Sequence, residues 1–365
     1  MDRFALTSVG LALFAYFAGD AVETLISTRT RRSHLWISNG FYHFTWPLYR
    51  RLCQVAKNPV RRESLLSVYG PSSLLALLVI WVAGLITAWA CIWTALRDSF
   101  VEPIGGFLDA LYYSGVVFFS VGFGDLLPTT GLMRILTIGE ALTGLATMGL
   151  VIGYLPSLYG AYQSREHRLL LLDDLTDSRI TPISFVRSHV PRKDDLSRLD
   201  AEFDAWSTWC AELYGTHSSF PMLVVFRSQH RGQSWVSALG VVTDAAMAAA
   251  AGLPESQSQS ALRLYRQATR TVQRLGEQIG MTPKTEMAFD SRYWSYGYSA
   301  MQQVVSDLRP FDESLARLIE LRREFTPWME AFLDVLDAPR GFWGPTSAET
   351  LVQPKLSGDF ERLGR

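Results

Sequence analysis

The sequence has few cysteines and almost no net charge. Its 365 residues include three cysteines, Cys53, Cys91 and Cys210, which lie far apart and form no CxxC pair. This spacing indicates neither a disulfide framework nor a zinc site. The formal net charge is −1, so no charge excess indicates nucleic acid as a partner. We also expect no cleavable signal peptide, because acidic residues follow the first apolar stretch without a small-residue cleavage site.

Several motifs of soluble enzymes and sensors are also missing. The chain has no Gly-x-Gly-x-x-Gly after a strand pattern, no Walker loop, no EF-hand loop and no HExxH. The sequence therefore predicts no nucleotide-binding Rossmann unit, no calcium loop and no metalloprotease site. We expect no cofactor, and we expect that the protein is not an enzyme.

Long apolar runs are plentiful in the first half of the chain. Leu74–Leu96 holds 23 residues without a charge, and Ile135–Leu155 is interrupted only by Glu140. A helix of about 20 apolar residues crosses the hydrocarbon core, so both runs are predicted spans. Phe4–Gly19, which continues past Asp20, is a third and shorter run. An interfacial or buried helix is the alternative for this third run.

Basic residues predict how the spans are oriented. Only one acid, Glu63, accompanies the basic residues between the first run and Leu74: Arg29, Arg31, Arg32, Arg50, Arg51, Lys57, Arg61 and Arg62. Because positively charged loops stay in the cytoplasm, we expect a multi-pass protein of the cell (inner) membrane with its N-terminus outside and its C-terminal domain inside. The aromatic segment His34–Trp46 is expected to lie along the inner interface, against lipid.

A short apolar segment and a glycine-rich turn separate the two longer spans. Phe107–Phe119 is too short to cross the membrane and leads into Ser120–Asp125, with the sequence SVGFGD. Non-helical backbone at membrane depth is tolerated only where protein buries it or where it lines a water-filled path, which indicates a re-entrant pore loop. A dehydrated potassium ion needs rings of oxygens, and four copies of one extended segment can supply them. Carbonyls that point the same way require positive φ, which Gly122 and Gly124 tolerate.

These requirements predict a role for each residue of the turn. We expect the potassium ligands to come from consecutive residues, Ser120, Val121, Gly122, Phe123 and Gly124, with the ions at the first four positions. Asp125 is expected at the outer mouth. Potassium is the permeant ion in this reading and not a cofactor.

From about Ala110 to Gly149 the sequence resembles the prokaryotic two-transmembrane type of potassium channel. Ala110–Ser114 resembles the start of the family's pore helix, Asp125–Pro128 resembles its outer mouth, and Gly144 and Gly149 fall at its hinge glycines. The resemblance implies an all-α membrane protein with an outer helix, a re-entrant pore helix plus filter and an inner helix, assembled as a homotetramer. Here one extra transmembrane helix would precede this module and a helical cytosolic domain would follow it.

Three residues depart from the family's pattern. Ser120 stands where threonine is usual, Phe123 replaces a tyrosine, and Val116 stands where some bacterial channels carry a glutamate. These differences predict a filter with fewer hydrogen-bonded braces. A weakly selective cation channel is therefore an alternative to a potassium-selective one. A membrane-tethered sensor or enzyme that acts through the soluble half is an alternative from another class.

Glu140 is the one acid inside the last predicted span. Ionisable residues within the membrane are functional candidates by default. Two roles are open at this stage. The carboxylate could hydrogen-bond within the protein to the pore helix, or it could face the ion cavity as part of a negative ring.

The chain turns polar from Arg165 onward, and the pattern divides it into three parts. These are 1–67, an N-terminal transmembrane helix with a basic interfacial segment; 68–164, the pore module; and 165–365, a helical cytosolic regulatory domain. Periodic apolar residues predict helices over Asp194–Tyr214, Ser234–Ala251, Leu262–Ile279 and Leu315–Leu336. His217, Arg227 and Glu212 could line a pocket for a small anionic effector. The alternative is an aromatic core that a buried Glu–Arg or His pair holds together.

Overall fold

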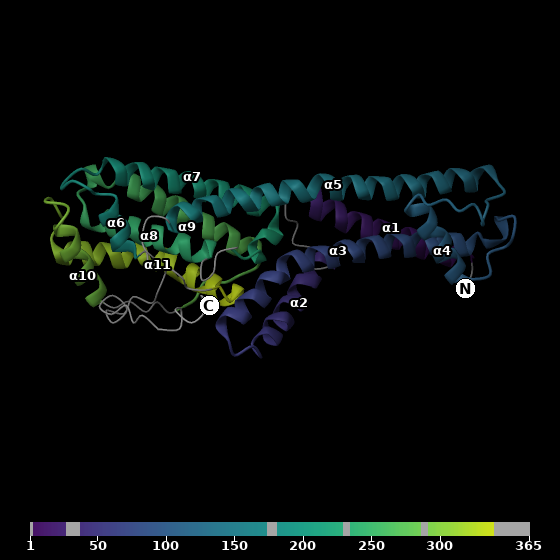
Figure 1. Ribbon diagram of the computed structural model, residues 1–365, viewed down its shortest axis with the longest axis horizontal. Helices are drawn as coiled ribbons and strands as arrows, with labels where there is room; N and C mark the ends of the chain where they lie inside the picture. Colours follow the sequence, from purple (N-terminus) through teal and green to yellow (C-terminus); the bar gives the residue numbers. More distant parts are fainter. Residues whose placement is uncertain (1–2, 27–36, 174–180, 229–233, 286–290, 339–365) are drawn as a thin grey trace, which may run out of the picture. The chain divides into compact units, whose positions relative to one another are not determined.

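A computed structural model of the chain describes residues 3–26, 37–173, 181–228, 234–285 and 291–338 (Figure 1). The α-helices are α1 Arg3–Ile26, α2 Ile37–Cys53, α3 Pro59–Ala95, α4 Phe107–Phe118, α5 Gly131–Asp173, α6 Pro182–Ser188, α7 Ser197–Ser219, α8 Trp235–Gly252, α9 Gln259–Gln278, α10 Ser291–Gln302 and α11 Phe311–Leu336. Three 3-10 turns are η1 Arg97–Ser99, η2 Pro221–Val225 and η3 Glu255–Gln257. Within the described ranges the only β pairing is an isolated bridge between Phe100 and Pro128, so the predicted all-α class is confirmed.

The chain separates into two compact units, Met1–Tyr162 and Gln163–Arg365. Helix α5 continues through this division without interruption. The sequence placed the corresponding boundary between residues 164 and 165. Its other boundary, at 67/68, falls inside α3, so the two segments on either side of it share one unit.

Helix α1 packs antiparallel along α3 in the first unit. The paired residues have numbers that each sum to 101: Arg3 with Asp98, Gly10 with Cys91, Phe17 with Gly84, and Asp20 with Trp81. The first three pairs are seven residues apart, which is the spacing of an a/d seam between supercoiled helices. Small residues in this seam permit close packing, as in membrane helix pairs. Gly10 lies against the Ala88 carbonyl oxygen, and Gly84 makes room for the Phe17 ring.

Helix α2 forms a second antiparallel contact, with the beginning of α3. Tyr69 lies at its centre, with its hydroxyl 2.8 Å from Thr45 Oγ1 and its ring 4.9 Å from the ring of Trp46. The Tyr49 hydroxyl donates to the Leu65 carbonyl oxygen at 2.9 Å. The aromatic segment expected along the interface is therefore largely a helix packed on α3. Residues 34–36 of that segment lie outside the described ranges.

Four helices in the described ranges are long and apolar enough to cross a membrane: Arg3–Leu25, Arg61–Ala95, Gly131–Leu172 and Trp235–Gly252. The first three contain the spans that the sequence predicts. The fourth is α8, which is wholly buried inside the second unit. A helix that is apolar all round is either a membrane span or the centre of a core, and its burial here identifies α8 as a core helix.

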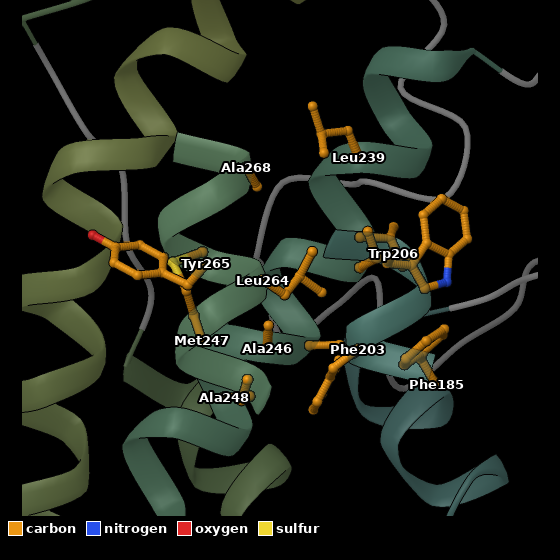
Figure 2. Close-up of a cluster of buried hydrophobic side chains, with 14 of the residues drawn as sticks. Phe185, Phe203, Trp206, Leu239, Ala246, Met247, Ala248, Leu264, Tyr265 and Ala268 are labelled. Carbon is orange, nitrogen blue, oxygen red and sulfur yellow. The ribbon is translucent and has the colours of Figure 1, made fainter. Parts of the chain in front are cut away.

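The second unit is built around α8. Phe185 of α6, Phe203 and Trp206 of α7, and Leu264 of α9 belong to the same buried cluster as its side chains (Figure 2). Helix α11 adds a buried ion pair, because Arg322 Nη1 lies 2.8 Å from Asp244 Oδ1 of α8. The four helices predicted for this half correspond to α7, α8, α9 and α11.

Candidate ion pathway

The Ser120–Asp125 turn has an alternating backbone. Gly122 and Gly124 have φ angles of 64° and 76°, the positive values that the aligned-carbonyl argument requires. Ser120 also adopts a positive φ, 55°, which the sequence did not predict. Left-handed residues therefore alternate with Val121 and Phe123 along the turn. Each of these residues is exposed in the single chain, including Phe123 at 69%.

Helix α4 ends directly before this turn. Its last turn continues as backbone hydrogen bonds, from Ser120 N–H to the Val117 oxygen and from Val121 N–H to the Val116 oxygen, each at 2.9 Å. These bonds fix where the turn begins. The negative end of the α4 dipole accordingly lies at the start of the alternating segment, where it favours a cation.

The Asp125 end of the turn is braced in a way that the sequence argument missed. The Tyr112 hydroxyl of α4 donates to Asp125 Oδ2 at 2.8 Å. Beyond Asp125, Val101 N–H donates to the Leu127 oxygen at 3.0 Å, which ties this part of the chain to the segment after α3. Phe123 has no hydroxyl that could link the turn to α4. The Tyr112 hydroxyl of α4 makes such a link instead, to Asp125.

Glu140 is fully buried and joins three helices. The Trp93 indole of α3 donates its Nε1–H to Glu140 Oε2 at 2.6 Å, and the Ser114 hydroxyl of α4 donates to Oε1. Of the two roles that the sequence left open, the structure favours the first, because Glu140 contacts α4, the helix that precedes the Ser120–Asp125 turn. Asp20 has a parallel arrangement, because the Trp81 indole of α3 donates to its Oδ2 at 2.6 Å.

Replacing Glu140 with alanine is expected to lower the free energy of unfolding in detergent. The change leaves the buried Trp93 N–H without its acceptor, at about 1–3 kcal/mol for an unsatisfied buried group. Glu140→Gln keeps one carbonyl acceptor and should lose less. Trp93→Phe alone and combined with Glu140→Ala completes a double-mutant cycle, and strictly additive losses would contradict this contact.

Helix α5 presents a continuous apolar stripe that nothing covers in the single chain. Its exposed residues recur every three or four positions: Leu132, Ile135, Ile138, Leu142, Leu145, Met148, Ile152, Leu155 and Tyr159. An exposed apolar face of this length indicates contact with lipid or with another polypeptide.

The two predicted hinge glycines have different surroundings. A Cβ at Gly144 would lie 1.9 Å from the Phe118 carbonyl oxygen, so α5 and the end of α4 touch backbone to backbone there. A Cβ at Gly149 would meet nothing within 4 Å. Helix α5 is continuous through both positions, and Gly144 has a packing role that its sequence position did not reveal.

The three residues predicted to line an effector pocket do different things. His217 is fully buried and lies 3.4 Å from Arg165 Nη1, whereas Glu212 is exposed on α7. Arg227 donates to the carbonyl oxygens of Leu336 and Asp337 at the end of α11. These contacts give the predicted pocket no support, and it stays a prediction. His217 belongs to a buried Arg–His–Glu cluster, which is the alternative that the sequence left open, and Arg227 caps a helix.

The comparisons with known proteins agree with this geometry. Residues 76–159 match the family model described as an ion channel, a segment that holds most of α3, all of α4, the Ser120–Asp125 turn and α5 to Tyr159. The protein therefore carries an ion-channel domain within an all-α, multi-pass membrane fold, and it is not an enzyme. This segment is less than half of the chain.

Two curated relatives extend the comparison. The uncharacterized membrane protein YdjJ of Bacillus subtilis is 28% identical over 243 residues, which cover 63% of this chain and 68% of that protein. Two-pore potassium channel 4 of Arabidopsis thaliana is 37% identical over 73 residues, which cover 20% of this chain and 26% of that protein. The first match is longer than residues 76–159, so it extends beyond the channel domain. No solved structure matches the chain.

Proposed function

We propose that this protein is one subunit of a homotetrameric potassium channel in the cell membrane. Potassium passes along Ser120, Val121, Gly122, Phe123 and Gly124, with Asp125 at the outer mouth. The observation that carries the proposal is the alternation of left-handed φ at Ser120, Gly122 and Gly124, directly after a short helix and between two long apolar helices. The similarity to a two-pore potassium channel supports the choice of ion.

The proposed tetramer is supported by what one filter strand lacks. A single chain supplies one set of carbonyls, and a ring of oxygens around an ion needs several copies. The exposed filter and the apolar stripe of α5 support assembly, because four copies would cover both with each other and with lipid. The antiparallel pairing of α1 with α3 supports an N-terminus outside, since the basic connection between them would then lie in the cytoplasm.

In this proposal α5 is the inner helix, and its gating is controlled by the second unit, Gln163–Arg365, which we call the soluble unit. Helix α5 carries the apolar stripe and continues into that unit, so a movement of the unit would act on the pore through one helix. The soluble unit would lie in the cytoplasm. Gly149, where added bulk meets nothing, is the better hinge candidate of the two glycines.

A weakly selective cation channel is the second candidate. It is favoured by Phe123, whose side chain lacks the tyrosine hydroxyl, and by Val116, which cannot brace the turn as a carboxylate would. The two candidates share the pathway and differ in how firmly the carbonyls are held.

Ion flux from liposomes tests whether the protein conducts at all. Purified full-length protein in liposomes loaded with potassium is expected to release potassium when the outside is potassium-free and the charge is balanced by a proton carrier. Liposomes without protein give the background. Flux at background over a range of pH and membrane potential, together with a monomer in mild detergent, would contradict the proposal.

A further inference from the structure

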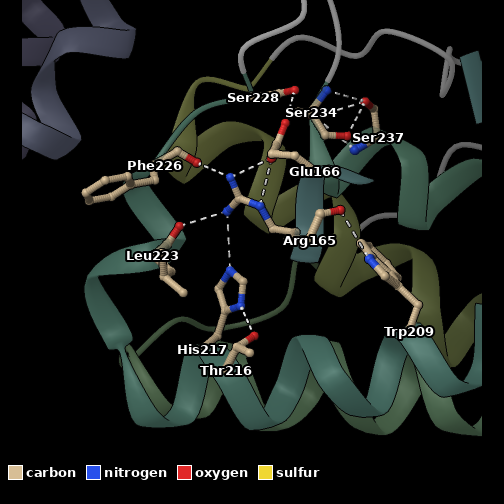
Figure 3. Close-up of polar contacts among 10 residues, drawn as sticks. All are labelled: Arg165, Glu166, Trp209, Thr216, His217, Leu223, Phe226, Ser228, Ser234 and Ser237. Atoms are coloured by element: carbon tan, nitrogen blue, oxygen red, sulfur yellow. Dashed lines mark hydrogen bonds and ion pairs between the residues drawn. The ribbon is translucent and has the colours of Figure 1, made fainter. Parts of the chain in front are cut away.

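Arg165 of α5 is a buried cation whose nitrogens all have partners. Its Nε donates to Glu166 Oε1 at 2.9 Å, and Nη2 donates to the Phe226 carbonyl oxygen at 2.9 Å (Figure 3). Nη1 donates to the Leu223 carbonyl oxygen at 3.0 Å and faces His217 Nε2 at 3.4 Å. Its side chain is 1% exposed. The guanidinium thus holds α5 to the end of α7 and to η2 through a fixed set of acceptors.

His217 is neutral in this cluster. Burial first, and then the charge of Arg165, lower the pKa of His217 well below its usual value. The neutral ring donates Nδ1–H to the Leu213 carbonyl oxygen at 2.9 Å, which leaves Nε2 to accept from Arg165. Glu166 supplies the opposite charge, and its other oxygen accepts from the Ser228 hydroxyl. The cluster is therefore an ion pair with a neutral third member.

The same stretch of α5 is held at further points within the second unit. The Trp209 indole donates to the Arg165 carbonyl oxygen at 3.3 Å, so α7 binds the backbone as well as the side chain (Figure 3). Arg168, one turn later, donates to Glu202 at 2.7 Å and lies over the Trp206 ring. Leu169 is buried in the core of the unit. Helix α5 is thus attached here by specific polar bonds and not by apolar packing alone.

Arg165 and Gly144 share one helix. They are 21 residues apart in the chain, and α5 is helical from one to the other. Pro156 is the only proline between them and removes one backbone hydrogen bond. A displacement of the attached end is therefore passed along a helix with one weak point to the segment beside the pore helix.

We infer that Arg165 is a positioning residue for the pore. Its bonds to Glu166, His217 and η2 form a joint through which the soluble unit sets the conformation of α5. This inference rests on the proposed channel function for its effect on conduction. The joint itself is a property of α5 and can be measured without ion flow.

The test compares two buried Arg–carboxylate pairs of the same unit. Arg165→Gln breaks the joint, and Arg322→Gln breaks the pair with Asp244, which lies between α11 and α8 and does not involve α5. The full-length protein is placed in lipid nanodiscs with Ile152→Cys, a site in the α5 stripe that is 71% exposed in the single chain. In the proposed tetramer lipid and neighbouring copies cover this stripe, so the reactivity of the thiol reports how closely α5 is covered. The natural thiols Cys53, Cys91 and Cys210 are buried and give a low background. The rate of maleimide labelling at residue 152 is measured for each protein.

We expect Arg165→Gln to change the labelling rate at residue 152 at least threefold. The open probability of the channel should change at least tenfold, and the permeability ratio between ions should stay the same. Arg322→Gln should leave the labelling rate unchanged even if it lowers the unfolding temperature as much as Arg165→Gln does. His217→Gln, which keeps an uncharged acceptor, should fold and give a smaller change in the same direction. The joint is refuted if neither Arg165→Gln nor His217→Gln alters labelling, or if Arg322→Gln alters it equally. Absent flux with altered labelling refutes the channel function alone.

Discussion

Replacing Gly122 with alanine is expected to abolish ion flux and to leave the rest of the fold intact. Gly122 has a φ of 64°, where an L-residue with a Cβ costs about 1–2 kcal/mol. In the proposed tetramer four such residues would cost about 4–8 kcal/mol, enough to depopulate the conducting backbone by at least a hundredfold. A Cβ there meets nothing within 4 Å in the single chain, so the loss comes from the backbone angle and not from a clash. Flux from liposomes and the unfolding temperature measure the two effects separately.

Gly40→Ala is the matched control for this substitution. Gly40 lies within α2, where an added Cβ also meets nothing and the backbone is helical. Flux should stay at the wild-type level and stability should rise slightly, since alanine is the better helix former. Wild-type flux in Gly122→Ala would mean that the alternating turn is not the pathway.

Replacing Gly144 with alanine is expected to impair both stability and conduction. The new Cβ would lie 1.9 Å from the Phe118 carbonyl oxygen, so α5 must move away from the end of α4. Overpacking of this kind typically costs about 1–3 kcal/mol. Phe118 is the last residue of α4 and lies two residues before Ser120, where the proposed filter begins, so the shift also displaces the segment that the ions would follow. The unfolding temperature in detergent and the ion flux from liposomes should both fall.

Gly149→Ala separates packing from hinge bending. Its Cβ is free of contacts, so stability should be unchanged or slightly higher, and any effect on flux would come from a stiffer helix. If Gly144→Ala and Gly149→Ala lower the unfolding temperature equally, the close approach of α5 to Phe118 is not what makes Gly144 necessary.

The membrane half of the fold could be predicted because the bilayer imposes simple rules on sequence. Lengths of apolar runs give the spans, and a Gly-x-Gly turn between two spans requires special backbone angles. The limits of α3 could not be read in this way. It begins at Pro59, well before the apolar run at Leu74, because α2 packs along its first turns. Such helix pairing depends on tertiary contacts that local pattern does not contain.

The polar contacts were the least predictable part. A buried acid in an apolar run must have a partner, and this rule singled out Glu140. The rule does not say that the partner is Trp93, 47 residues earlier. Tyr112 and Arg165 lacked any comparable signal, because tyrosines and arginines are common at membrane borders. The predicted effector pocket gains no support for a related reason, since nearness in sequence did not place Glu212 on the buried face of α7.

The reversal potential with potassium on one side of a planar bilayer and sodium on the other tests the central claim most directly. A firmly held ring of carbonyl oxygens should prefer potassium by at least tenfold, and each factor of ten in permeability shifts the potential by about 59 mV. For the wild-type protein we predict a reversal potential about 59 mV or more away from 0 mV, in the direction that potassium selectivity gives. Gly122→Ala should carry no such current. Currents that reverse near 0 mV would contradict a potassium-selective filter and would favour the weakly selective channel.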